Sequence, residues 1–124
     1  MKTYPGRAND RIVYTEVGNT FVSVRQLARV IGRVPGVSAV RVRGLFQSTG
    51  DVRMWFDFLG VPMEMAEPFG DNSRYWIGPA AERDDPPDLS PIDDALRAYR
   101  PLLGMIIWVT LVAAWLVFEL IESR

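Results

Sequence analysis

The chain has 124 residues, a formal charge of −1, and neither cysteine nor histidine. The absence of these two residue types excludes disulfides, cysteine nucleophiles, the usual zinc sites and histidine acid–base catalysis. The glycine-rich patterns that bind dinucleotides or nucleotide phosphates are also absent from the sequence. We therefore expect no cofactor and no metal.

The first residues lack the apolar run that follows the charged start of a secretory signal peptide, so the chain is expected to begin as a soluble segment. Residues 11–17 are rich in β-branched and aromatic side chains, which predicts a strand. Gly18 and Asn19 predict a tight turn after it, and residues 20–22 a short returning strand.

An amphipathic helix is predicted directly after this hairpin. Ser23 and Gln26 have the spacing of a capping box. Pro35 and Gly36 end the helix. Apolar residues recur at helical spacing on one stripe, which comprises Val24, Leu27, Ala28, Ile31 and Val34.

Strands are predicted after the helix over residues 37–46, 51–59, 61–67 and 74–77. This order predicts an α+β fold, a small antiparallel sheet with one packed amphipathic helix. A parallel βαβ unit is the main alternative, because the helix separates two strands.

Composition divides the chain into five parts. Residues 1–79 are predicted to form the soluble domain, and residues 80–90 an acidic, proline-containing linker. Ser90 as N-cap and Pro91 at the first position predict a juxtamembrane helix over residues 91–100. A membrane helix over residues 101–121 and a short tail, 122–124, complete the chain.

The membrane helix is predicted from residues 101–118, which carry no charge. At about 1.5 Å per residue this stretch is about 27 Å long, close to the ~30 Å hydrocarbon core of a bilayer. The alternative, a buried core helix, would have to be apolar all round in a domain with nothing left to cover it.

The charges beside this helix predict its orientation. Arg97 and Arg100 precede it, whereas Glu119, Glu122 and Arg124 surround its end. The positive-inside rule then places the N-terminal domain in the cytoplasm, the layout of a single-pass, tail-anchored protein. Arginine supplies 13 of the 14 basic residues, which indicates a GC-rich bacterial genome and hence the bacterial inner membrane.

Contacts to other membrane helices are predicted at Gly104, Trp108, Trp115 and Glu119. The two tryptophans are seven residues apart and share one face, which contacts either a partner helix or lipid. Glu119 either extends its side chain toward the interface or pairs with a basic group of another subunit.

A partner-binding surface is predicted on the soluble domain, because tryptophan, tyrosine and arginine are favoured at binding hot spots. The alternative is that the aromatic residues cover the edge of a small core. The predicted residues are Trp55, Arg74, Tyr75, Trp76, Arg41, Arg43 and Arg53.

A second basic set, Arg25, Arg29 and Arg33, follows one flank of the predicted helix. It is expected to point away from the arginines of the sheet, so that the two sets form no single patch. A charged outer surface is the simplest interpretation of these residues. If they bind an anion, lipid headgroups are favoured over nucleic acid.

The carboxylates of the sheet region match no catalytic motif, so we predict a protein that is not an enzyme. The hypothesis is an accessory subunit or adaptor of a membrane complex, whose cytoplasmic domain binds a protein partner. An inhibitory binder at the membrane, such as an immunity or exclusion protein, is the alternative. Besides the bilayer and this partner, neither nucleic acid nor a small-molecule ligand is expected.

Overall fold

The computed structural model describes residues 1–124 except 19–21, 45–50, 68–73, 101 and 124, and the side chains of residues 102–107 also lie outside the described part. Its elements follow the chain as β1 (Thr3–Ala8), β2 (Arg11–Gly18), α1 (Val24–Gly32), β3 (Val37–Val42), β4 (Val52–Phe58), β5 (Val61–Ala66), β6 (Arg74–Pro79), α2 (Ser90–Ala98) and α3 (Leu102–Glu122).

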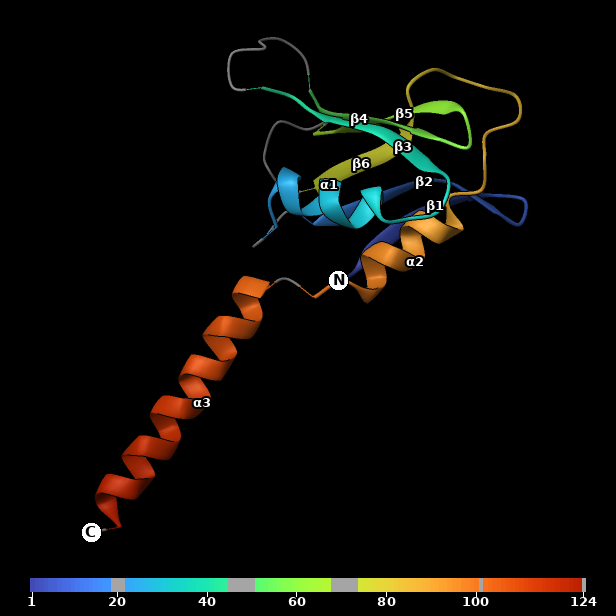
Figure 1. Cartoon of the computed structure of the whole chain (residues 1–124). Helices are drawn as coiled ribbons and strands as arrows, with labels where there is room; N and C mark the ends of the chain where they lie inside the picture. The colour runs from blue at the N-terminus through green and yellow to red at the C-terminus, as the bar shows by residue number, and fades with distance from the viewer. Residues whose placement is uncertain (19–21, 45–50, 68–73, 101, 124) are drawn as a thin grey trace.

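The six strands form one sheet in the order β1-β2-β6-β5-β4-β3 (Figure 1). Every neighbouring pair is antiparallel. The predicted α+β class with an antiparallel sheet is therefore confirmed, and the parallel βαβ alternative is wrong. The last strand of the meander, β6, returns beside β2, which joins the N-terminal hairpin to the rest of the sheet.

Strand β1 was not predicted, because Pro5 and Gly6 are unfavourable inside most strands. The fold accommodates both residues by placing β1 at the edge of the sheet, where a missing N–H donor is tolerated. Of the returning strand predicted over residues 20–22, the first two residues lie outside the described part. Val22 is buried but belongs to no strand.

Helix α1 begins as predicted. The Gln26 amide donates to Ser23 Oγ at 3.2 Å, and the Ser23 amide donates to Gln26 Oε1 at 2.7 Å. This capping box pairs two backbone donors that the first turn of a helix leaves without partners. The apolar stripe then packs inward, with Leu27 and Ile31 fully buried.

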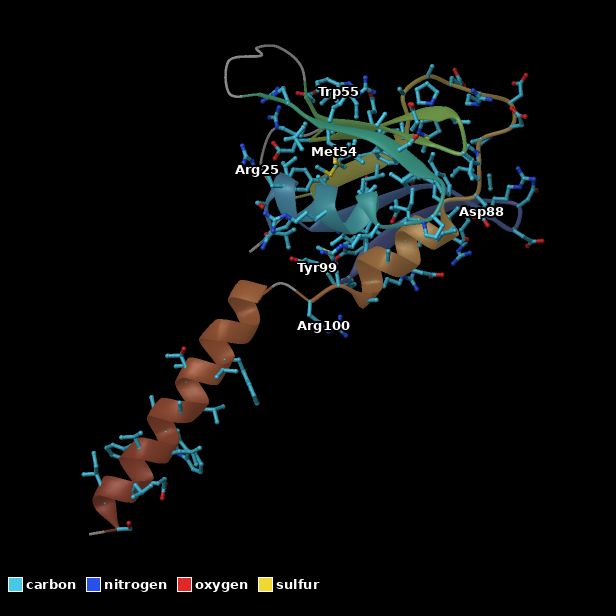
Figure 2. The ribbon with its side chains drawn as sticks, viewed as in Figure 1. Arg25, Met54, Trp55, Asp88, Tyr99 and Arg100 are labelled. Atoms are coloured by element: carbon cyan, nitrogen blue, oxygen red, sulfur yellow. The ribbon has the colours of Figure 1, made fainter. Side chains whose placement is uncertain are left out.

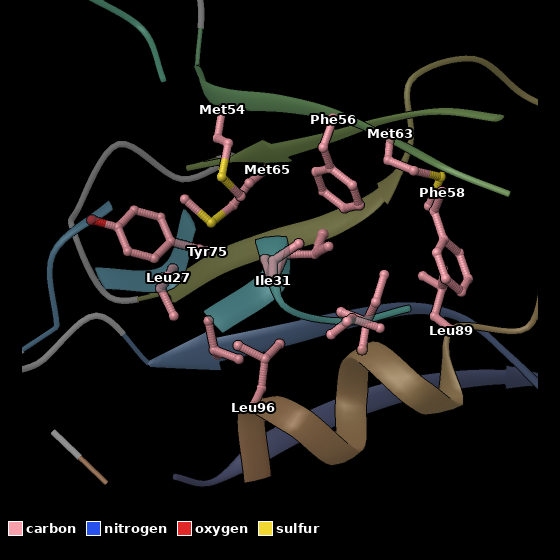
Figure 3. Close-up of a cluster of buried hydrophobic side chains, with 14 of the residues drawn as sticks. Leu27, Ile31, Met54, Phe56, Phe58, Met63, Met65, Tyr75, Leu89 and Leu96 are labelled. Carbon is pink, nitrogen blue, oxygen red and sulfur yellow. The ribbon is translucent and has the colours of Figure 1, made fainter. Parts of the chain in front are cut away.

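Helices α1 and α2 lie on the same face of the sheet (Figure 1). The core between them and the sheet is drawn in Figure 3. Ile92 and Leu96 of α2, together with Leu89 just before the helix, supply part of it. Two helices therefore pack on the sheet where one was predicted. The buried core extends past Pro79 to the end of α2.

The segment between β6 and α2 follows the sheet closely. The Ala80 amide donates to the Pro62 carbonyl at 3.0 Å, and the Leu89 amide donates to the Ile12 carbonyl at 2.9 Å. Leu89 is fully buried, which fixes the far end of the segment in the core. An acidic, proline-containing composition is typical of a linker, but these contacts bind the segment to the domain.

Helix α2 has a different cap from the one predicted. Ser90 is its first helical residue, and Asp88 provides the acceptor. Asp88 Oδ1 accepts from the Ser90 hydroxyl at 2.7 Å, the Ile12 amide at 3.0 Å and the Ser90 amide at 3.1 Å. The Ser90 hydroxyl, followed by the Ile12 amide, lowers the pKa of Asp88 below its ordinary value of 3.8.

Replacing Asp88 by Asn should make the free energy of unfolding depend less strongly on pH in the acidic range. Because the folded state lowers this pKa, the stabilisation is complete above pH 3.8 and is lost as the pH falls through the folded-state pKa. At pH 7 the loss of the charged cap should cost about 1 kcal/mol. Urea unfolding between pH 2 and 7 measures both effects. Asp84→Asn, at an exposed site in the same segment, is the control, and an identical acid limb in D88N would contradict the assignment.

A buried polar network fixes α2 on the first two strands. Asp93 is 1% exposed, accepts from the Thr15 hydroxyl at 2.7 Å, and pairs with Arg97 Nε at 2.9 Å. Arg97 Nε also donates to Thr3 Oγ at 2.8 Å. The α-amino group of Met1 donates to the carbonyls at the end of the same helix, those of Leu96, Arg97 and Tyr99.

Helix α3 extends away from the sheet and packs against no other described element (Figure 1). Its described side chains are exposed on every side, including Trp108 at 67% and Trp115 at 60%. Glu119 is exposed as well, and the side-chain surroundings of Gly104 lie outside the described part. Within the part of the chain that the structure describes, no helix is both long and apolar enough to cross a membrane.

Candidate functional site: the outer face of the sheet

The face of the sheet opposite the two helices carries aromatic side chains. On β4, Trp55 lies on this outer face, whereas Met54 points toward the helices (Figure 2). On β6, Trp76 lies on the outer face between the buried residues Tyr75 and Ile77. Strand alternation thus separates an aromatic outer surface from the apolar core.

Two of the aromatic rings lie flat on the sheet because they cover glycines. A Cβ atom added at Gly78 would come within 2.6 Å of the Trp76 ring, and one added at Gly6 would overlap the Tyr14 ring. The Tyr14 and Trp76 rings stack with centroids 6.1 Å apart and planes inclined by 28°. Because these two glycines have no side chain, the Tyr14 and Trp76 rings can lie directly against the backbone of the sheet.

Beside this pair, a cation–π contact extends the surface to the edge strand. The Arg74 guanidinium lies 3.6 Å from the centroid of the Tyr4 ring and also pairs with Glu16 at 3.2 Å. The Lys2 ammonium lies 5.3 Å from the same ring. Arg74 is thus held in one orientation by an aromatic ring and a carboxylate together.

A groove of about 590 Å³ runs between this surface and the segment after β6. Tyr14 and Trp76 form one wall. The opposite wall consists of Ala81, Glu82, Arg83, Asp84 and Pro86. The groove is therefore lined by aromatic and other apolar side chains together with charged ones, a mixture found in many protein-binding surfaces.

Glu64 lies in the middle of the outer face. On β5 it is opposite Trp55 of β4 and opposite Gly78 of β6, the residue that the Trp76 ring covers. Burial by these neighbours raises the pKa of Glu64. Among the described residues it forms no ion pair. The surface thus presents a half-buried carboxylate between aromatic rings.

The structure divides the predicted partner-binding residues into three groups. Trp55, Arg74 and Trp76 share the outer face, and Arg41 joins them because it lies opposite Trp55. Tyr75 does not, because it points into the core and is only 7% exposed. Arg43 and Arg53 line a separate groove beside α1.

Strand alternation alone would place Arg53 on the same face as Trp55. Arg53 does not lie there, because the register between β4 and β5 shifts between Val52 and Met54. Its guanidinium pairs with Glu67 at 3.3 Å. Burial and the Glu67 carboxylate together raise the pKa of Tyr75. Arg53, Glu67 and Tyr75 therefore form a polar group at one end of the sheet, away from the aromatic surface.

Sequence reasoning missed Tyr4, Tyr14 and Glu16 as members of the outer face. Tyr14 and Glu16 are two residues apart in a predicted strand, so their common face could have been read from the alternation. Tyr4 had no such signal, because the strand that carries it was not predicted. The spacing of Gly6 and Tyr14 gives no indication of their contact, which forms only when β1 pairs with β2.

No group of three or more acidic side chains within the described residues is arranged to hold a metal ion. A comparison with known protein families, curated proteins and solved structures found no match. An aromatic surface with one fixed arginine and one half-buried carboxylate is suited to binding a protein.

Proposed function

We propose that this chain is a membrane-anchored, non-enzymatic adaptor or accessory subunit whose outer sheet face binds a partner protein. The observation that carries the proposal is the aromatic surface around Glu64. A partner that covers it would bury apolar area while presenting a lysine or arginine to a carboxylate that has no described ion pair.

The anchor in this proposal is α3, with the soluble domain on the cytoplasmic side of a bacterial inner membrane. Two observations support it. The sequence has no charge between residues 101 and 118, and the described apolar side chains of α3 are exposed around the helix. A helix that is apolar all round is stable only where protein or lipid covers it. Trp108, Trp115 and Glu119 are the described positions where a neighbouring membrane helix would be detected.

Removing residues 102–124 should release the domain from the membrane. The full chain is expected in the membrane pellet after washes with high salt and alkaline carbonate, and the truncated chain in the supernatant. The core lies within residues 1–98, so the truncated chain should still show a cooperative unfolding transition. Extraction of the full chain by carbonate, or retention of the truncated chain after the salt wash, would contradict anchoring by α3.

Trp55→Ala and Glu64→Gln should weaken partner binding while the chain stays folded and in the membrane. Truncating a central aromatic anchor should reduce the affinity roughly 30-fold, the factor that corresponds to about 2 kcal/mol. The measurement is quantitative copurification after extraction in mild detergent. Leu59→Ala is the control, since Leu59 is an exposed apolar residue at the turn between β4 and β5, outside this surface.

The identity of the copurifying protein separates the two functions considered. Integral subunits of one complex would support the accessory role, and a single cognate toxin would support the inhibitory binder instead. Recovery of the full chain alone and monomeric would contradict both. Equal recovery of partner with W55A, E64Q and the unmodified chain would place the binding surface elsewhere.

A further inference from the structure

A second surface, separate from the aromatic face, lies between α1 and β3. Two adjoining hollows of about 380 and 160 Å³ share Val42, Arg43 and Gly44. Their remaining lining residues come from α1 and β4. We call this surface the basic groove, and its other members are Val24, Arg25, Ala28, Arg29 and Arg53.

The basic groove brings together arginines that were expected to point in opposite directions. Arg25 and Arg29 come from α1, Arg43 follows β3, and Arg53 belongs to β4. They meet because α1 packs on β3 at the edge of the sheet and because the register shift in β4 redirects Arg53. The lining of the groove is therefore rich in arginine, and Val24, Ala28 and Val42 add apolar surface to it.

The excess charge of the groove comes from α1, because Arg53 pairs with Glu67 at 3.3 Å. Residues 17–50 contain five arginines and neither aspartate nor glutamate. Arg25 and Arg29 are four residues apart on the helix and form no ion pair with a described residue. Like charges at that spacing weaken a helix, and Arg25 lies in the first turn, where the positive end of the helix dipole adds to its charge. An anion in the groove would relieve both repulsions.

Acidic residues are concentrated in the segment after β6 and in α2. Six carboxylates lie between residues 82 and 94. Figure 2 shows Arg25 and Asp88 on opposite sides of the domain. An anionic surface would therefore attract one end of the domain and repel the other, which gives the domain a defined orientation.

The short connection to α3 limits where an anionic surface would be met. Helix α2 ends at Ala98 and α3 begins at Leu102. Four residue steps span at most about 14 Å. If α3 is in the membrane, the end of α2 stays within about that distance of the start of the membrane helix, which is not far beyond the roughly 8 Å over which charge acts at physiological salt.

We propose that the basic groove binds the phosphate groups of anionic lipids, so that the α1–β3 edge of the domain lies against the membrane. This inference rests on the proposed anchoring by α3. The planar, multi-donor guanidinium groups match phosphate oxygens, and the apolar lining residues suit the glycerol and first acyl carbons next to the headgroup. The aromatic outer face, on the other side of the sheet from α1, then remains accessible to a protein partner.

The test uses the full chain in lipid nanodiscs. The protein has no cysteine, so one fluorophore can be attached at Gly32→Cys, an exposed position on α1 three residues after Arg29, or at Ala8→Cys in β1 as the control position. Nitroxide groups on the lipid headgroups quench a fluorophore that lies close to the membrane surface. We expect at least roughly threefold more quenching at position 32 in discs containing phosphatidylglycerol than in neutral phosphatidylcholine discs, and no such difference at position 8.

Charge reversal and salt complete the test. Arg25→Glu with Arg29→Glu should abolish the difference at position 32, and 0.5 M salt should reduce it about as strongly, because the Debye length then falls to roughly 4 Å. Equal quenching in both kinds of disc would overturn the assignment of the groove to lipid phosphate but would leave anchoring by α3 intact. Protection of position 32 by an RNA oligonucleotide in neutral discs, without a response to phosphatidylglycerol, would overturn the lipid assignment in favour of nucleic acid. Failure of the chain to enter either disc would overturn the anchoring proposal and this inference together.

Discussion

Replacing Phe56 by Ala should lower the free energy of unfolding by about 3–5 kcal/mol. Phe56 is fully buried between the sheet and the two helices (Figure 3). Its loss removes an aromatic ring from the centre of the core and leaves a cavity that the surrounding side chains fill only in part. A domain of this size has roughly 5–15 kcal/mol of total stability, so the variant should be near the limit of folding.

Trp55→Ala is the matched control for this prediction, because the two aromatic residues are adjacent on β4 and point to opposite faces. Urea unfolding should show a large fall in midpoint for F56A and a much smaller one for W55A. F56A should thus lower the stability of the domain, whereas W55A should weaken partner binding and leave most of the stability unchanged. A larger loss of stability in W55A than in F56A would contradict the division of β4 into a core face and a binding face.

Replacing Arg97 by Met should cost about 3 kcal/mol, although the Arg97 side chain is 49% exposed. The physical reason lies with its partner, because Asp93 is 1% exposed and would be left as a buried carboxylate without a cation. The Thr15 hydroxyl would remain its hydrogen-bond donor. The cost lies at the low end of the range for breaking a buried ion pair, since half-exposed Arg97 leaves water a path to the site.

A double variant distinguishes the buried charge from simple loss of packing. Asp93→Asn combined with Arg97→Met removes the carboxylate together with its cation, and it should be more stable than R97M alone. The amide oxygen of Asn can still accept from Thr15. Thermal unfolding of both single variants and the double variant measures the coupling. A double variant whose loss equals the sum of the two single losses would show that the pair contributes no coupling energy.

The parts of the fold that were predicted are those in which one local rule suffices. The Ser23 and Gln26 capping box starts α1 without help from the rest of the chain. The alternation within β4 separates buried Phe56 from Trp55 on the outer face, and it too can be read from the local sequence. By contrast, α2 packs on the core through Ile92 and Leu96, and Leu89 just before it is buried as well; only tertiary contacts reveal this. The composition before it resembles a linker, because proline and aspartate are common in both linkers and capped turns.

The candidate site was only partly predictable for a similar reason. Alternation shows that Tyr75 and Trp76 point to opposite faces, but it does not show which of them faces the core. That choice is made by the pairing of β6 with β2 and β5, residues far apart in the sequence. The convergence of Arg25 and Arg53 likewise depends on a register shift that the sequence does not reveal.

The hydrogen bonds of the Met1 amino group have a mechanical consequence. The chain leaves the domain through the end of α2, where the carbonyls of Leu96, Arg97 and Tyr99 accept from that group. Any force transmitted along α3 therefore reaches the domain at the point where its first and last elements are joined. Pulling on the helix loads this junction and the Asp93–Arg97 pair first, while the aromatic face and the basic groove lie outside the direct path of the load.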